Sequence, residues 1–215
     1  MRINLYRMTH IVNVPHILAN GITHKDSPNF NRDYLTIGDL SLIDNRNSKT
    51  VVVDNGNFNK RDAEVITLGN YIPFYFGVRM PMLYVIQNGG NFVTHATPPE
   101  DIVYLVCSLE LIIKEGHDFY FTDGHATDGF TSFYDKTRLE DLKDIIDWES
   151  VKAQFWSGQE NLNVKRKKQA ECLVQGDISP ETLIGFGCFN QNTADKLTAM
   201  SIAADKIKII PNAYF

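Results

Sequence analysis

The chain has 215 residues, of which 43% are hydrophobic and 22% are charged, and its formal net charge is −5. That length and composition are typical of a single globular domain with room for a sizeable core. The acidic balance excludes a protein that binds nucleic acid over its whole surface, so any such site must be a local patch. No apolar run approaches the ~20 residues of a membrane-spanning helix, and we expect no membrane association.

The cysteines and the first residues indicate the cellular compartment. Cys107, Cys172 and Cys188 are scattered, odd in number and set in apolar runs. This pattern is typical of buried thiols in a reducing compartment, and not of a disulfide framework or a zinc site. Residues 1–7 alternate polar and apolar side chains and lack the apolar stretch of a signal peptide. We therefore expect a cytoplasmic protein that holds no metal ion.

Short runs of β-branched and aromatic residues predict strands, and apolar residues at helical spacing beside a capping residue predict helices. In chain order, the sequence predicts a strand at 3–6, a helix at 13–21, a turn-rich loop at 25–34, strands at 50–53 and 101–107, a helix at 109–114, a strand at 119–122, helices at 139–146 and 148–156, strands at 169–175 and 184–189, a helix at 194–203 and a strand at 207–210.

Five further segments are less defined. Residues 72–76 and 82–86 are strongly apolar, residues 37–44 fit a helix or an extended segment, and residues 123–135 fit a glycine-rich loop or an irregular helix. Residues 54–70 are polar, and a loop of that length in a compact domain is often functional or mobile. Because strands and helices mix without regular βαβ alternation, the expected fold class is α+β.

The most informative stretch places four consecutive cations, residues 165–168, just before Glu171 at the start of a short apolar run. A carboxylate that enters a core is costly to bury unless something pairs with it or uses it. The cations would favour its ionised form and attract a polyanion, although such a run is more often a solvated face. Nearby Phe155 and Trp156 could stack on bases, but their helical spacing with Val151 favours packing in the core.

Three other sites place a polar side chain where it could reach a ligand. Arg7 and Thr9 are two positions apart at a predicted strand end and so share a face, unless that edge is simply solvated. Arg46 has the planar fork that suits a pyrophosphate, although a surface arginine is the commoner case. His125 follows a predicted strand in a glycine-containing loop. No glycine-rich dinucleotide fingerprint follows a strand, so a nucleotide would be held in some other way.

Several motifs occur in a fixed order along nearly the whole chain: Tyr6-Arg7-Met8-Thr9-His10-Ile11, residues 71–76 with 79–84, Phe121-Thr122-Asp123-Gly124-His125, and Lys167-Lys168-Gln169-Ala170-Glu171. Together they resemble the DarT family, the DNA ADP-ribosyltransferase toxins of bacterial toxin–antitoxin pairs. The resemblance implies one ADP-ribosyltransferase domain over residues 1–215, a mixed fold with a central, mainly antiparallel β core and surrounding helices. It also implies transfer of ADP-ribose from NAD to a base in single-stranded DNA, thymine in the better-known branch.

The resemblance further implies roles for individual residues. Glu171 matches the catalytic glutamate, and Arg46 matches the arginine that grips the NAD phosphates and assists catalysis. Residues of about 25–47 resemble the NAD-binding element, and those of about 125–171 resemble the loop that presents DNA. The other NAD contacts that it implies are Arg7, Met8, Thr9, His16 and His24. The DNA contacts that we expect are His125, Lys165, Arg166, Lys167 and Lys168.

Partners and alternatives follow from the same reasoning. The resemblance implies a macrodomain antitoxin that removes ADP-ribose, and this chemistry requires no metal. An ADP-ribosyltransferase that modifies a protein side chain would have the same glutamate and NAD site, so only the acceptor separates the two. A regulator that binds nucleic acid without catalysis is a further alternative, against which the net acidity argues.

Overall fold

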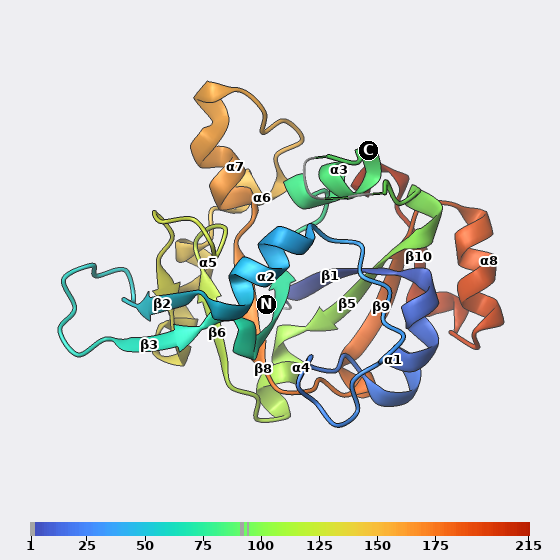
Figure 1. Ribbon diagram of the computed structural model, residues 1–215, viewed down its shortest axis with the longest axis horizontal. Coiled ribbons are helices and arrows are strands. Elements are labelled where there is room, and N and C mark those ends of the chain that lie inside the picture. The colour runs from blue at the N-terminus through green and yellow to red at the C-terminus, as the bar shows by residue number, and fades with distance from the viewer. Residues whose placement is uncertain (1–2, 91–92, 94) are drawn as a thin grey trace.

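The computed structural model of the protein describes residues 3–90, 93 and 95–215, and its frame is one large β-sheet (Figure 1). The strands of this sheet are β1 (Asn4–His10), β4 (Tyr71–Tyr75), β5 (Ile102–Ser108), β6 (Phe119–Thr122), β7 (Phe133–Tyr134), β8 (Glu171–Gln175), β9 (Leu183–Cys188) and β10 (Ile207–Ile209). Their order is β10–β9–β5–β1–β4–β8–β6–β7, and only β9 and β10 pair in parallel. The expected mainly antiparallel α+β core is confirmed.

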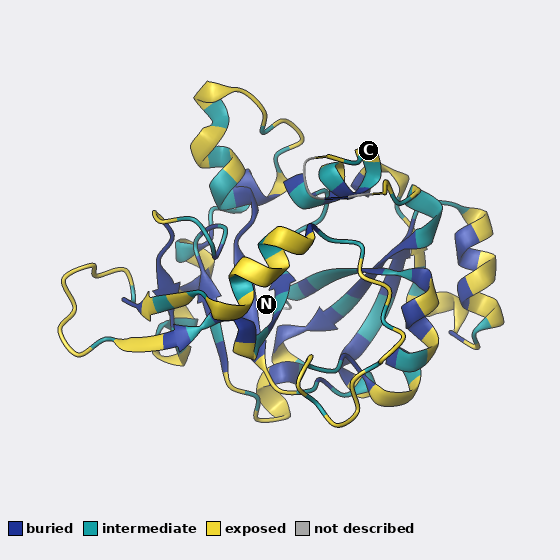
Figure 2. Cartoon of the chain, viewed as in Figure 1, coloured by how far each residue is buried: buried dark blue, intermediate teal, exposed yellow. Residues whose placement is uncertain are grey.

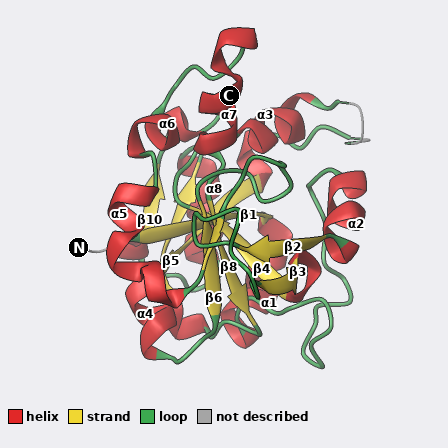
Figure 3. Ribbon diagram, turned by 90° about the vertical axis from the view of Figure 1, so that its left-hand side faces the viewer, coloured by secondary structure: helices red, strands yellow, loops and turns green. Residues whose placement is uncertain are grey.

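Helices surround this sheet, as Figure 3 shows. They are α1 (Val14–Asn20), α2 (Leu40–Ser48), α3 (Pro81–Asn88), α4 (Leu109–Lys114), α5 (Leu142–Ile145), α6 (Trp148–Lys152), α7 (Leu162–Lys168) and α8 (Gln191–Ala199), with short 3-10 turns between elements. The main core contains side chains from the middle of the sheet, among them Leu5, Phe74 and Leu105, all without exposed surface. Within the described ranges, no helix combines the length and the apolar character needed to cross a membrane.

The central strand β1 pairs very differently with its two neighbours. Its pairing with β5 runs from Asn4 to His10, whereas its pairing with β4 is recorded only at Tyr6 opposite Tyr75. Pro73 has no backbone N–H to offer, and the guanidinium of Arg7 donates to its carbonyl oxygen at 3.0 Å. The sheet is therefore opened between β1 and β4, and a side chain takes over one of the missing ladder bonds.

The structure corrects the predicted loop at 54–70. Its second half forms strand β3 (Glu64–Thr67), which pairs antiparallel with β2 (Thr50–Val53), and a 3-10 turn follows at Leu68–Asn70. β-Branched residues explain the strand, because Ile66 of β3 and Val53 of β2 are buried in a small second core. The hairpin projects from the body with an exposed loop, seen at the left of Figure 2.

Two other segments show where sequence patterns were insufficient. The ambiguous stretch at 37–44 contributes to helix α2, whose first turn is capped by the Asp39 carboxylate accepting from the Leu42 N–H. The predicted helix at 148–156 ends at Lys152. The predicted core packing is wrong for Phe155, which is 86% exposed because the chain leaves the helix before reaching it. The three cysteines are buried free thiols, as expected.

Candidate active site

Glu171 is the first residue of β8, which lies inside the large sheet between β4 and β6. It lies opposite Tyr75 of β4, and its backbone N–H donates to the Thr122 hydroxyl at 2.9 Å. The side chain is 1% exposed. One carboxylate oxygen accepts the N–H of Ala126 at 2.9 Å, and the other accepts Arg46 Nη2 at 2.7 Å. A buried carboxylate with both oxygens hydrogen-bonded in this way is fixed in its orientation.

The charge partner of Glu171 is therefore Arg46, and not the neighbouring basic run. Arg46 lies in the last turn of α2, a helix with no buried residue that stands out as exposed in Figure 2. Its side chain is 16% exposed, and its buried Nε has no partner among the described residues. The guanidinium thus binds Glu171 with one nitrogen and retains donors for an anionic ligand.

The position of Arg46 depends on a close backbone contact behind α2. Gly69, in the turn after β3, lies so close to the next helical residue, Asn47, that a Cβ added there would be 2.3 Å from the Asn47 carbonyl oxygen. Only glycine permits this approach. His24 reaches the same glycine, with Nε2 at 2.8 Å from the Gly69 carbonyl oxygen.

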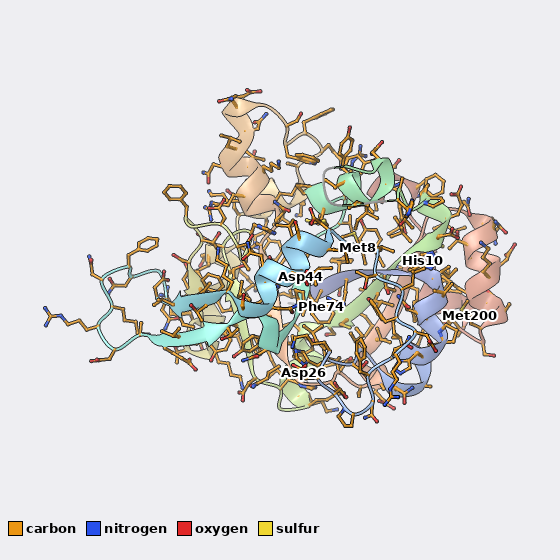
Figure 4. The ribbon with its side chains drawn as sticks, in the orientation of Figure 1. Met8, His10, Asp26, Asp44, Phe74 and Met200 are labelled. Atoms are coloured by element: carbon orange, nitrogen blue, oxygen red, sulfur yellow. The ribbon has the colours of Figure 1, made fainter. Side chains whose placement is uncertain are left out.

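A cavity of about 450 Å³, here called the smaller cavity, opens where β1 and β4 separate. Of the residues predicted to bind NAD, all but Thr9 line it: Arg7, Met8 (labelled in Figure 4), His16, His24 and Arg46. Thr9 is fully buried behind the wall, where its hydroxyl lies 3.2 Å from the Tyr34 hydroxyl. Tyr34 itself lines the cavity, so the contact of Thr9 with the cavity is indirect and passes through the Tyr34 side chain.

The residue that holds this wall together, Asn13, is one that sequence patterns do not indicate. Asn13 precedes the first turn of α1 but makes no side-chain cap there; its amide donates to the Leu35 carbonyl and accepts the Leu35 N–H, both at 2.9 Å. The same amide also donates to the Thr9 hydroxyl at 3.0 Å. Asn13 is fully buried, and it fastens the loop before α2 to β1.

A second cavity of about 1250 Å³, the larger cavity, is lined by Leu42 of α2 and by His125. Met82 of α3 lines both cavities, and α2 contributes Arg46 to one and Leu42 to the other. Glu171 itself lines neither cavity: it contacts Arg46 of the smaller cavity and the backbone of Ala126, the residue after His125 of the larger cavity. Lys165 and Arg166 line the larger cavity as well, and Asp123 pairs with Arg166 at 3.0 Å.

His125 stands between Glu171 and the larger cavity. Its backbone N–H donates to the Arg166 carbonyl at 3.0 Å, and Nδ1 lies 2.9 Å from the Thr127 hydroxyl. Burial lowers the pKa of His125, while the negative charge of Glu171 raises it and Arg46 lowers it again. The imidazole is therefore neutral near neutral pH. Burial also raises the pKa of the Tyr75 hydroxyl, and the adjacent Glu171 charge raises it further.

Among the described residues, no group of three or more histidine, cysteine or acidic side chains is arranged to hold a metal ion.

Comparison with known proteins identifies the family. A family model described as ssDNA thymidine ADP-ribosyltransferase, DarT, matches residues 6–215. The chain is also 34% identical over 172 residues to a DNA ADP-ribosyl transferase of Thermus sp. (strain 2.9), which covers 79% of this chain and 73% of that protein. The chain belongs to the DarT family.

Solved DarT structures share the fold. DarT of Thermus sp. 2.9 in complex with ADP-ribosylated ssDNA aligns with a TM-score of 0.80 at 26% identity, covering 99% of this chain and 96% of that one. The NAD⁺ complex aligns with a TM-score of 0.75 at 25% identity, covering 99% and 98%. A DNA ADP-ribosyl transferase–DNA ADP-ribosyl glycohydrolase fusion protein of Thermosipho africanus is 29% identical over 213 residues, 98% of this chain and 48% of that protein.

The DarT assignment confirms the expected family, fold class and NAD-dependent DNA ADP-ribosyltransferase activity. Two of the predicted DNA-binding cations, however, do not line the larger cavity. Lys167 pairs with Asp147 at 2.8 Å, and Lys168 is 1% exposed, with its ammonium donating to the Val151 carbonyl at 2.9 Å. Successive residues of a helix point in different directions, so a run of cations in α7 cannot present a single face.

Proposed function

We propose that this chain transfers ADP-ribose from NAD⁺ to a thymine base in single-stranded DNA, with Glu171 and Arg46 as its catalytic residues. The observation that carries the proposal is that the Glu171 carboxylate bonds both Arg46, which lines the smaller cavity, and the N–H of Ala126, next to His125 of the larger cavity. A transferase must bring two substrates to one reacting carbon, and a buried, oriented carboxylate in such a position can act on both.

The smaller cavity is the proposed NAD site. Arg7, Met8, His16 and His24 would contact the dinucleotide directly, and Thr9 would act through Tyr34. The segment of about 25–47 would serve as the NAD-binding element, since Lys25, Tyr34 and Arg46 of this segment line the cavity. The unpartnered Nε of Arg46 supports a role in binding the pyrophosphate, because the arginine fork matches phosphate oxygens.

The proposed chemistry breaks the bond between ribose C1′ and the nicotinamide nitrogen, and nicotinamide leaves with the electron pair. The Glu171 carboxylate stabilises the positive charge that develops on the ribose. The thymine N3 nitrogen then forms a bond to C1′, and its proton passes to Glu171. Arg46 holds the pyrophosphate so that C1′ faces the incoming nitrogen.

The larger cavity is the proposed DNA site, formed by the segment of about 125–171. His125, Lys165 and Arg166 line it and could contact a nucleotide there. Direct contact by Lys167 would require its ion pair with Asp147 to open, and Lys168 contributes only by holding the loop beneath it. The basic character of this site is therefore smaller than the sequence indicated.

An acceptor assay tests the function and separates it from its alternatives. Labelled NAD⁺ is incubated with the protein and a thymine-containing oligonucleotide, a thymine-free one, or a protein lysate. We expect label only on the first, and a loss of about a hundredfold or more in Glu171→Gln. Label on proteins alone would support the protein-modifying alternative, and DNA binding without NAD⁺ consumption would support the regulator.

We also propose that the chain is a toxin acting in the cytoplasm beside a macrodomain antitoxin. The buried free thiols support a reducing compartment. A relative fused to a glycohydrolase supports a partner that reverses the modification. If so, a macrodomain ADP-ribosyl glycohydrolase should release ADP-ribose from DNA that this chain has modified. Modified DNA that resists the glycohydrolase would contradict this part of the proposal.

A further inference from the structure

Three aromatic rings from distant parts of the chain meet at the rim of the larger cavity. Tyr84 of α3 lies 6.1 Å from Trp156 and 5.2 Å from Phe215 between ring centroids, and Trp156 and Phe215 are 6.3 Å apart. All three pairs are nearly perpendicular. With the neighbouring Phe155 they all line the cavity, and we call these four residues the aromatic platform. Figures 1 and 3 show α3, α6 and α7 together at this end of the molecule.

The platform is not part of the core. Phe155 is 86% exposed, Tyr84 is 47% exposed and Phe215 is 36% exposed. Large aromatic rings left in water at the edge of a cavity indicate a surface that binds something. Edge-to-face packing holds the rings against one another, so the surface is already formed.

Cations stand over the same rings. The guanidinium of Arg79 lies 4.4 Å from the centroid of Phe215, and the ammonium of Lys165 lies 5.6 Å from that of Trp156. Within the described ranges, neither cation has an acidic side chain within 4.0 Å, and the buried Nε of Arg79 has no hydrogen-bond partner. Arg79 also has a φ of 57°, a region that residues with a Cβ rarely adopt.

We infer that the aromatic platform stacks the bases that flank the modified base of single-stranded DNA, while Arg79 and Lys165 bind the phosphates between them. Exposed aromatic rings interleaved with cations suit unpaired nucleic acid. Every base offers a π-face that stacks on a ring, and every phosphate linkage carries a negative charge that a cation can bind. A protein partner would need a complementary acidic and apolar surface, whereas single-stranded DNA always carries both features.

This inference rests on the proposed function for its geometry. His125 lines the same cavity as the platform and lies close enough to Glu171 for that charge to affect its pKa. A target base at His125 would therefore leave its neighbours on the strand directed along the cavity towards the platform. Stacking is tolerant of base identity, so the platform would set the required length of DNA more than its sequence.

Binding and transfer can be measured separately. Binding of a fluorescent oligonucleotide with one central thymine is followed by anisotropy without NAD⁺, and transfer is followed in a single turnover. A second oligonucleotide carries abasic sites on both sides of the thymine. The variants are Phe155→Ala, Trp156→Ala and the conservative Trp156→Phe, with Phe58→Ala as the matched control. Phe58 is 74% exposed on the β2–β3 hairpin loop and lies outside the cavity lining.

We expect Phe155→Ala and Trp156→Ala to bind the intact oligonucleotide about tenfold more weakly, with Trp156→Phe and Phe58→Ala close to the parent protein. On the abasic oligonucleotide the alanine variants should show no further loss, because the stacking partner is already missing. If the alanine variants lose equal affinity for both oligonucleotides, or lose none for either, the platform inference is overturned. The proposed function would still stand if the parent protein transfers ADP-ribose. No transfer by the parent, with platform-dependent binding retained, would overturn the function alone.

Discussion

Arg46 Nη2 lies 2.7 Å from the carboxylate of Glu171, although the two residues are separated by 125 positions in the chain. One side chain comes from an exposed helix and the other from a buried strand end. Their contact therefore joins α2, in the proposed NAD-binding element, to strand β8 of the large sheet. Because the carboxylate is 1% exposed and the guanidinium 16%, the consequences of removing each partner differ.

Removing Arg46 should cost more stability than neutralising Glu171. Arg46→Ala leaves a buried carboxylate charge without its partner, and we expect the free energy of unfolding to fall by about 3 kcal/mol. Glu171→Gln keeps an oxygen for the Ala126 N–H and leaves a partly exposed cation, so the loss should be about 1 kcal/mol. Urea unfolding measures both. The double variant should be more stable than Arg46→Ala alone, and a still less stable double variant would contradict the pairing.

Gly69 lines the proposed NAD site and should be required there because its close backbone contact positions α2. In Gly69→Ala the new Cβ would meet the carbonyl oxygen and Cα of Asn47 at 2.3 and 2.7 Å, and backbone atoms cannot turn aside. We expect α2 to shift, with a loss of about 1–3 kcal/mol in stability and weaker NAD⁺ binding by calorimetry. Gly129→Ala is the control, because its added Cβ would meet nothing within 4 Å. NAD⁺ affinity equal in the two variants would show that the close contact does not position Arg46.

The basic residues of α7 should differ in their effect on DNA binding. Lys165 lines the larger cavity, so Lys165→Ala should reduce the slope of log affinity against log salt by about 0.7, the value for one phosphate on a single strand. Lys168→Met should leave this slope unchanged, because the ammonium is buried against backbone carbonyls. Titrations between low and physiological salt measure both slopes. The same reduction in both variants would mean that α7 rearranges when DNA binds.

Lys168 should also make stability depend on pH. Burial lowers the pKa of its ammonium to about 8, and the positive charge of Arg79 adds to the effect. The unfolded chain, with an ordinary lysine pKa of about 10.4, holds its proton at pH values where the folded chain has released it. The free energy of unfolding should thus rise between about pH 8 and pH 10 in the parent protein relative to Lys168→Met. A constant difference across that range would contradict the lowered pKa.

What the sequence predicted and what it missed have physical reasons. Strands such as β5 and β8 were found because short apolar runs leave few alternatives, and the family resemblance implied that Glu171 and Arg46 share one site. Sequence patterns could not show which of the four cations at 165–168 line the larger cavity, because the direction of each side chain depends on where α7 begins. The Ala126 N–H that orients Glu171 was hidden for a different reason, since a backbone donor leaves no trace in residue type.

Asn13 is the clearest missed residue, and it should control NAD⁺ affinity without touching NAD⁺. Its amide makes two hydrogen bonds to the Leu35 backbone and one to Thr9, which fasten the loop carrying Tyr34 against β1. In Asn13→Ala the loop must be ordered by the ligand itself, and the loss of three hydrogen bonds worth about 1 kcal/mol each should raise KM for NAD⁺ by about a hundredfold at most. KM for DNA should not change, because the loop does not line the larger cavity. Asn20→Ala is the matched control, since Asn20 is exposed and donates only within its own helix. Steady-state kinetics with each substrate varied in turn would measure both KM values. An equal rise in both would show that Asn13 contributes to folding in general and does not position the NAD⁺ loop.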